Sequence, residues 1–331
     1  MNRDANIDLV KSTAMLMICI GHALHFSSGG LSNITGTWVD TFNHILMVIC
    51  LIGVNLFALS SGYILIDKEW KLSSYLRLFF QVAFYTVSIF ATLFCLSRCN
   101  IISLEKDIVD EFVKVELPLP IVKGYWYFQA YSVVFFCIPF LNKIINSLCP
   151  SQTTILLVLL FLLFSVYQFA GSGFSPLWLA YMYLLGAYIK RHKVTNLISS
   201  KACIITTTVA ICVVYFAKSQ NLSWWWHYSS PLNCLQAIAW FLITLKIKIQ
   251  SNSMLTKALQ TTSLLSFGIY LAHVHPLMID TESKAISYMW SKLGHAWWGL
   301  PLIGCIVFIC GLIIDYLRLQ LFRYCGVLRK R

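Results

Sequence analysis

Long apolar runs, each bounded by a few polar or charged residues, recur from one end of this sequence to the other. Globular proteins instead place apolar residues periodically. Each run approaches the length of about 20 residues that an α-helix needs to cross a bilayer. We therefore predict an all-α, polytopic membrane helical bundle of about ten transmembrane helices, at residues 9–28, 43–66, 75–97, 125–146, 153–171, 176–190, 202–217, 231–246, 263–281 and 299–320.

The basic residues predict the orientation of these helices. With the N-terminus inside, 18 of the 25 Lys and Arg residues fall in cytoplasmic segments. Cytoplasmic loops of membrane proteins carry this excess of basic residues, so we predict an even number of spans with both termini in the cytoplasm. The net charge of +12 lies in short loops between apolar runs. It therefore indicates contact with a lipid bilayer and not with nucleic acid.

Composition agrees with a single membrane domain over residues 1–331, with no appended soluble domain. Of the 331 residues, 58% are hydrophobic and 11% are charged, against about 25% charged in soluble domains. The twelve cysteines are scattered singly, mostly within apolar runs. They lack the spacing of a metal or redox site, so we interpret them as packing residues and predict no metal.

The first apolar run carries ionisable residues, Lys11 near its start and His22 near its end. Such residues are costly to bury in a membrane and commonly mark a functional site. Eleven positions at about 100° each return to nearly the same helix face, roughly 16 Å further along. One elongated ligand could therefore contact both residues, with its anionic part at Lys11 and its reactive end at His22.

Five stretches add a further pattern. They are Ile7-Asp8-Leu9-Val10-Lys11 with His22 after ten more residues, Phe57-Ala58-Leu59-Ser60-Ser61-Gly62-Tyr63-Ile64-Leu65, Tyr125-Trp126-Tyr127-Phe128 followed by Pro139-Phe140-Leu141-Asn142, Leu184-Leu185-Gly186-Ala187-Tyr188, and Ser266-Phe267-Gly268-Ile269-Tyr270-Leu271-Ala272-His273. In this order, they resemble motifs of the acyltransferase-3 family of integral membrane acyltransferases. Two positions depart from the family pattern. Lys11 stands where the family usually has Arg, and its R-x-x-R element is reduced to Ser74-Tyr75-Leu76-Arg77.

The resemblance implies transfer of an acyl group, most simply acetyl, from cytoplasmic acyl-CoA to a hydroxyl of a cell-surface glycan or its lipid-linked precursor. It implies a multi-pass protein of the bacterial inner membrane, with acetyl-CoA as co-substrate. Acyl transfer to a sugar hydroxyl needs a general base, for which histidine is suited. We predict that His22 is this base and that His273 has a supporting role, such as orienting the acceptor. A purely structural histidine, bonded to a neighbouring helix, is the alternative for each.

The other predicted site residues are expected to bind the phosphates of coenzyme A, the thioester oxygen of the acyl group, or the substrate. Lys11 and Arg77 are predicted to bind coenzyme A phosphates, with Asp8 holding Lys11 through an i,i+3 pair; simple positive-inside anchoring is the alternative. Asn55 and Ser61, with Ser60, could donate to the thioester oxygen or join helices. Within the motifs, Tyr63, Trp126 and Tyr270 are predicted to contact substrate.

Two aromatic clusters, Trp224 to Tyr228 and Trp297-Trp298, fall in predicted outer loops. They are typical of an interfacial belt, although such rings can also stack on sugars. Two other function classes remain open. A transporter or flippase for a lipid-linked glycan would leave the pairing of Lys11 with His22 without a purpose. A glycan polymerase would be expected to have a larger outer loop than residues 98–123.

Overall fold

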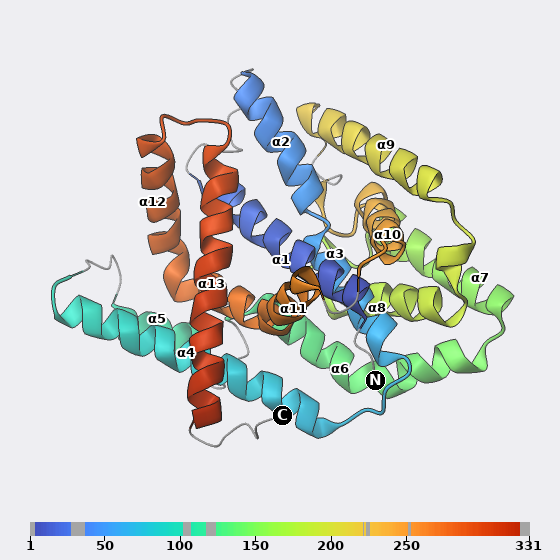
Figure 1. Ribbon diagram of the computed structural model, residues 1–331, viewed down its shortest axis with the longest axis horizontal. Helices are drawn as coiled ribbons and strands as arrows, with labels where there is room; N and C mark the ends of the chain where they lie inside the picture. Colours follow the sequence, from blue (N-terminus) through green and yellow to red (C-terminus); the bar gives the residue numbers. More distant parts are fainter. Residues whose placement is uncertain are drawn as a thin grey trace.

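The computed structural model describes residues 4–27, 37–101, 107–116, 124–220, 222, 226–250 and 253–324. Within these ranges the regular elements are all helical, which confirms the predicted fold class. The elements pack as one bundle, with α1 near its middle and α5, α7, α9 and α12 at its edges (Figure 1).

The helix α1 (Ala5–Phe26) is the central element. It packs against α3 (Gly53–Leu65), α11 (Met254–His273) and α13 (Gly299–Tyr324). A Cβ added at Gly304 of α13 would lie 2.6 Å from the Cα of Ile20, so this glycine lets the two backbones touch. Close approach of this kind through small residues is how helices associate tightly in membranes.

Two motif glycines seat α3 against α8 (Pro176–Arg191). A Cβ at Gly62 would lie 1.9 Å from the Tyr183 carbonyl oxygen, and a Cβ at Gly186 would lie 2.0 Å from the Leu59 carbonyl oxygen. Backbone atoms occupy both spaces, so neither position can hold a larger residue without separating the helices. These motifs therefore have a packing role.

The remaining helices surround this centre. They are α2 (Trp38–Cys50), α4 (Leu72–Arg98), α5 (Ile108–Glu116), α6 (Trp126–Ser147), α7 (Pro150–Phe161) with a π-helical turn (Leu162–Val166), a 3-10 turn (Val194–Asn196), α9 (Ser200–Ser219), α10 (Pro231–Leu245) and α12 (Pro276–Lys292).

Among the described residues, six helices are long and apolar enough to cross a membrane: α1, the continuous pair α2–α3, α4, α6, α9 and α13. A seventh is added if the bent pair α11–α12 counts as one span. The predicted fifth span corresponds to the continuous stretch Pro150–Val166, formed by α7 and the π-helical turn. The predicted sixth and eighth spans correspond to helices of 16 and 15 residues. The predicted count of about ten is therefore not confirmed, because these three helices are short for a full crossing.

The predicted ninth span, 263–281, is not one straight helix. α11 ends at His273, and α12 begins at Pro276 in a direction 87° away. Proline has no N–H to donate and is favoured at the first position of a new helix. Here the His275 side chain caps α12 by accepting from the Leu277 N–H at 3.2 Å. The bend puts His273 at the end of α11.

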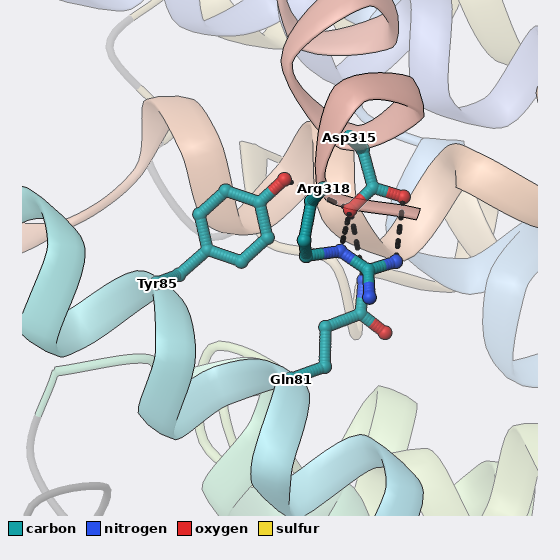
Figure 2. Close-up of polar contacts among 4 residues, drawn as sticks. All are labelled: Gln81, Tyr85, Asp315 and Arg318. Atoms are coloured by element: carbon teal, nitrogen blue, oxygen red, sulfur yellow. Dashed lines mark hydrogen bonds and ion pairs between the residues drawn. The ribbon is translucent and has the colours of Figure 1, made fainter. Parts of the chain in front are cut away.

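The predicted last span, 299–320, contains a buried ion pair. Arg318 Nε and Nη2 lie 2.5 and 3.2 Å from the two oxygens of Asp315, which is 0% exposed. From α4, the Tyr85 hydroxyl and the Gln81 amide also donate to Asp315, at 2.8 and 3.2 Å (Figure 2). We name these four side chains the Asp315 cluster. Arg318, one of the 18 basic residues counted in predicted cytoplasmic segments, is thus paired with Asp315, a pairing that was not predicted from the sequence.

Candidate functional site

α1 and α11 run side by side in the same direction, joined by side-chain contacts along their length. The Ser12 hydroxyl donates to the Leu259 carbonyl at 3.4 Å, and the Lys11 ammonium donates to the Ser263 carbonyl at 3.2 Å. Further along, His22 Nδ1 lies 3.0 Å from His273 Nε2. Lys11 and His22 therefore lie on one continuous helix, and both face α11. Because α1 is unbroken between them, their predicted placement on a common helix face holds.

The hydrogen-bond partners of His22 and His273 indicate which ring nitrogen of each histidine carries the proton. His273 Nδ1 lies 2.6 Å from the Ile269 carbonyl oxygen, which can only accept, so Nδ1 carries the proton. In a neutral His273, Nε2 is then an acceptor and must receive its hydrogen bond from His22 Nδ1–H. This leaves the lone pair of His22 on Nε2. Among the described residues, no hydrogen-bond partner meets that atom.

Cys19 lies one turn before His22 on the same helix. Its Sγ is 3.9 Å from His273 Nε2, and the side chain is fully buried. A thiol is a weak donor, so this contact adds little to the stronger one from His22. With Nε2 of His273 as the acceptor, the Cys19 thiol is a second, weak donor to the same atom.

A cavity with about 430 Å³ of atom-free space adjoins His22. Its other lining residues are mainly apolar or aromatic: Met15, Ile18, Val54, Phe57, Trp126, Tyr127, Tyr228, Phe267 and Tyr270. An apolar cavity with a few polar groups is the usual form of a small-molecule site. Of the predicted residues, His22, Trp126 and Tyr270 line this cavity. His273 is not among the lining residues, but it contacts His22.

Aromatic stacking builds the wall of this cavity opposite α1. Trp126 begins α6 and stacks on Tyr228, with ring centroids 6.0 Å apart and planes at 15°. Phe174 packs against both rings, at 4.6 and 4.9 Å. Such pairs add about 0.5–1.5 kcal/mol each beyond the area they bury. Tyr228 is thus part of the cavity wall, whereas its neighbours Trp224 and Trp225 lie outside the described residues.

Three predicted substrate contacts from α3 lie elsewhere. Asn55 is fully buried, donating to the Tyr228 carbonyl at 3.0 Å and accepting from Trp178 Nε1 at 2.9 Å. The Ser61 hydroxyl donates to the Phe57 carbonyl at 3.0 Å, as Ser60 does to Leu56. The structure therefore gives these polar groups bonds within the protein.

Tyr63 lines a second, polar cavity near the start of α1. This cavity has about 530 Å³ of atom-free space, and its other lining residues are Asp4, Asn6, Ile189, Lys190, Lys193, Thr195, Asn196 and Leu245. The Lys190 ammonium lies 5.2 Å from the centre of the Tyr63 ring and 2.7 Å from Asp67. Tyr63 is six residues from Phe57, which places the two cavities roughly 9 Å apart along α3.

The predicted coenzyme A residues are not brought together by any contact described above. Asp8 is buried at 3% exposed, and Lys11 is half-buried against α11. Arg77 is exposed on α4 and donates to the Ser73 carbonyl within its own helix. A shared phosphate site for Lys11 and Arg77, and the pairing of Asp8 with Lys11, stay predictions.

Sequence reasoning missed the contact between His22 and His273, because 251 residues separate them. It also missed Phe267 and Tyr228 as cavity residues. Phe267 could have been found, since it lies three residues before Tyr270 and therefore on the same helix face. Tyr228 belongs to the aromatic cluster noted in the sequence, but its place in the cavity depends on packing against Trp126 and Phe174.

Comparison of the chain with curated proteins and with solved structures gave no match. A family model described as an acyltransferase domain matches residues 4–316. The matched range includes both histidines and the whole cavity beside them. Because the match extends over nearly the whole chain, the protein belongs to the acyltransferase-3 family of membrane acyltransferases.

Proposed function

We propose that this protein transfers an acetyl group from cytoplasmic acetyl-CoA to a hydroxyl of a cell-surface glycan or its lipid-linked precursor. His22 is the general base, and His273 holds its ring in the required tautomer. The observation that carries the proposal is the His22 side chain, which lines the apolar cavity and whose Nε2 has no hydrogen-bond partner among the described residues. A general base must reach the proton that it removes, and the presence of His22 in the cavity lining supports this role.

The reaction needs no group beyond the two substrates. Nε2 of His22 takes the proton of the acceptor hydroxyl while the hydroxyl oxygen attacks the thioester carbon. The carbon–sulfur bond then breaks, and the coenzyme A thiolate takes the proton from the His22 imidazolium. Throughout, His273 Nε2 accepts from His22 Nδ1–H, as an orienting partner does in other histidine-based sites.

The polar cavity that Tyr63 lines supports a binding site for the phosphate groups of acetyl-CoA, the acyl donor. Lys190 and Lys193 line it, and Lys11 lies on the same α1 helix between this cavity and His22. Lysine binds phosphate as a point charge. An acyl-CoA entering from this end would extend along α1 and α3 for roughly 9–14 Å before its thioester reached the aromatic cavity.

A groove between α4 and α13 supports a lipid-linked acceptor. It has about 1250 Å³ of space, and its lining is mainly apolar, from Phe84 and Leu93 to Leu317. Ala272 also lines it, one residue before His273. A lipid tail in this groove would therefore lie close to the two histidines.

The membrane placement follows from the same proposal. Contacts of Gly304 with Ile20 and of Gly268 with Asp315 show that α13 runs opposite to α1 and α11. The start of α1 and the end of α13 are therefore on one side of the bundle. With the excess of basic residues there, we propose that this side is cytoplasmic, in a bacterial inner membrane crossed about ten times.

Mass spectrometry of surface polysaccharide and of its lipid-linked precursor, from cells with and without the protein, tests the proposal. Loss of about 42 Da per repeat without the protein is expected, since acetyl replaces hydrogen on the acceptor oxygen deprotonated by the base. An unchanged repeat mass with less polysaccharide at the surface would contradict acyl transfer. That result would favour a transporter or a polymerase.

A further inference from the structure

Tyr270 lines the same cavity as His22. The side chain is 6% exposed, and its oxygen is fully shielded from solvent. Of the residues that line this cavity, Tyr270 alone has a fully shielded polar atom with no hydrogen-bond partner in the described part of the chain. The Tyr127 N–H approaches the oxygen from the start of α6 without completing a hydrogen bond. Buried hydroxyls are normally bonded, so this one is available to a ligand.

The position of Tyr270 relative to the histidines is fixed by α11. Tyr270 precedes His273 by three residues, and side chains at this spacing lie on one helix face. His273 in turn contacts His22 at 3.0 Å. The Tyr270 hydroxyl and the His22 lone pair therefore belong to one cavity and approach a bound ligand from neighbouring helices.

Neighbouring rings hold Tyr270 in place. Its ring centroid lies 5.7 Å from that of Tyr125, 6.1 Å from Tyr127 and 6.2 Å from Phe267, where the rings stack. The Tyr125 hydroxyl donates to the Leu271 carbonyl at 2.8 Å and so fixes this ring to the α11 backbone. A donor fixed before the substrate arrives needs no rearrangement during the reaction.

Other candidate donors from the second span are already used. The hydroxyls of Ser60 and Ser61 donate to carbonyls one turn back in α3. Asn55 lies outside the cavity lining, with its amide nitrogen bonded to the Tyr228 carbonyl. These residues are therefore poorly placed to bind a developing charge beside His22.

We infer that the Tyr270 hydroxyl donates a hydrogen bond to the carbonyl oxygen of the transferred acyl group and stabilises the oxyanion of the tetrahedral intermediate. This rests on the proposed function, and it assigns Tyr270 as a catalytic residue. When the acceptor oxygen attacks, the electron pair of the C=O double bond moves onto that oxygen. His22 then holds the acceptor's proton. Collapse of the intermediate restores the double bond and releases the coenzyme A thiolate.

The test is the Tyr270→Phe variant, which keeps the ring and removes the donor. Acetyl transfer from labelled acetyl-CoA to endogenous glycan is measured in membranes, with donor concentration varied. We expect kcat to fall about 10²–10³-fold, which is typical for loss of one oxyanion donor, with KM for acetyl-CoA changed less than about threefold. Thermal unfolding of the purified variant in detergent should match the unmodified protein, because this hydroxyl bonds to no described residue.

Tyr127→Phe is the matched control, since Tyr127 is a second tyrosine that lines the cavity. Its loss of kcat should be at most about tenfold, well below the effect of losing an oxyanion donor. A larger loss for Tyr127→Phe than for Tyr270→Phe would overturn the assignment. So would a kcat for Tyr270→Phe within about fivefold of the unmodified protein, or a change confined to KM.

The His22→Ala variant separates failure of this inference from failure of the proposed function. If His22→Ala abolishes transfer while Tyr270→Phe does not, the general base stands and the oxyanion donor is wrong. If both variants transfer acetyl at the unmodified rate, neither residue has the assigned role. If membranes that lack the protein transfer acetyl as fast as membranes that contain it, the proposed function itself is wrong.

Discussion

Two polar clusters adjoin α11, and they differ in whether their hydrogen bonds are complete. In the Asp315 cluster, four donor groups from Tyr85, Gln81 and Arg318 meet the two carboxylate oxygens (Figure 2). In the cluster of His22, His273 and Tyr270, two polar atoms of cavity-lining residues bond to no described residue. These are His22 Nε2 and the Tyr270 oxygen.

This difference distinguishes a cluster that stabilises the fold from one that can bind a ligand. A buried carboxylate with a bidentate arginine partner and further donors is electrostatically complete, so it joins helices and offers nothing to a ligand. An unsatisfied buried polar atom costs about 1–3 kcal/mol, and such a cost persists where the atom serves a function. Ionisable residues inside a membrane domain are thus informative only after their partners are counted.

Breaking the Asp315 cluster should produce the largest change in stability. Asp315→Asn leaves the Arg318 guanidinium without its charged partner, and we expect a loss of about 3–5 kcal/mol in the free energy of unfolding. Chemical denaturation of the purified protein in detergent measures it. Replacing both residues with leucine should recover most of the loss, because an apolar pair of similar volume is often neutral. A double variant as unstable as Asp315→Asn would mean that the cluster does more than join α4 to α13.

Changing His273 should produce an intermediate effect, confined to activity. His273→Phe keeps the ring and removes the acceptor for His22 Nδ1–H, so we expect kcat to fall about 10–100-fold, as for other residues that orient a ligand or base. His273→Gln presents an amide oxygen in place of Nε2 and should restore part of this loss. Equal rates for the two variants, at equal thermal stability, would show that His273 is a packing residue and not an orienting one.

The smallest effect is expected at His227, in the loop that carries Tyr228. Partial burial lowers the pKa of His227 below its ordinary value of 6.5. The folded protein therefore binds this proton more weakly than the unfolded chain, and the contribution of His227 to stability is complete above about pH 6.5 and lost as the pH falls below it. His227→Gln should flatten the stability profile between pH 7 and pH 5. The same slope in the variant would assign the pH dependence to other groups.

The sequence predicts well what depends on one helix. The α-helical repeat alone places Lys11 and His22 on one face of α1, and the apolar run 9–28 predicts that helix to within a few residues. Family motifs then identify His273 and Tyr270 as site residues. The pairing of His22 with His273 depends on how α1 packs against α11, which no local pattern encodes.

Elsewhere, the limits of prediction have specific physical causes. The 87° bend after α11 was missed, although Pro276 marks a favoured helix start. Asp315 and Arg318 are spaced i,i+3 in an apolar run, which is the pattern of an ion pair on one helix face. Arg318 was counted only among the 18 basic residues of the predicted cytoplasmic segments, so this ion pair was not predicted. The short helices α7, α8 and α10 leave the number of crossings undetermined, since burial inside a bundle and burial in lipid favour the same apolar residues.

The most direct test of the central claim is the transfer of labelled acetyl from acetyl-CoA to glycan by membranes that contain equal amounts of the unmodified protein or of His22→Ala. If His22 is the general base, the variant should lose about 10²–10⁴-fold in rate. Its amount and insertion should be unchanged, and its thermal stability should fall only modestly, because the loss of the His22 ring leaves His273 Nε2 without its donor. Transfer by His22→Ala at the unmodified rate would contradict the account.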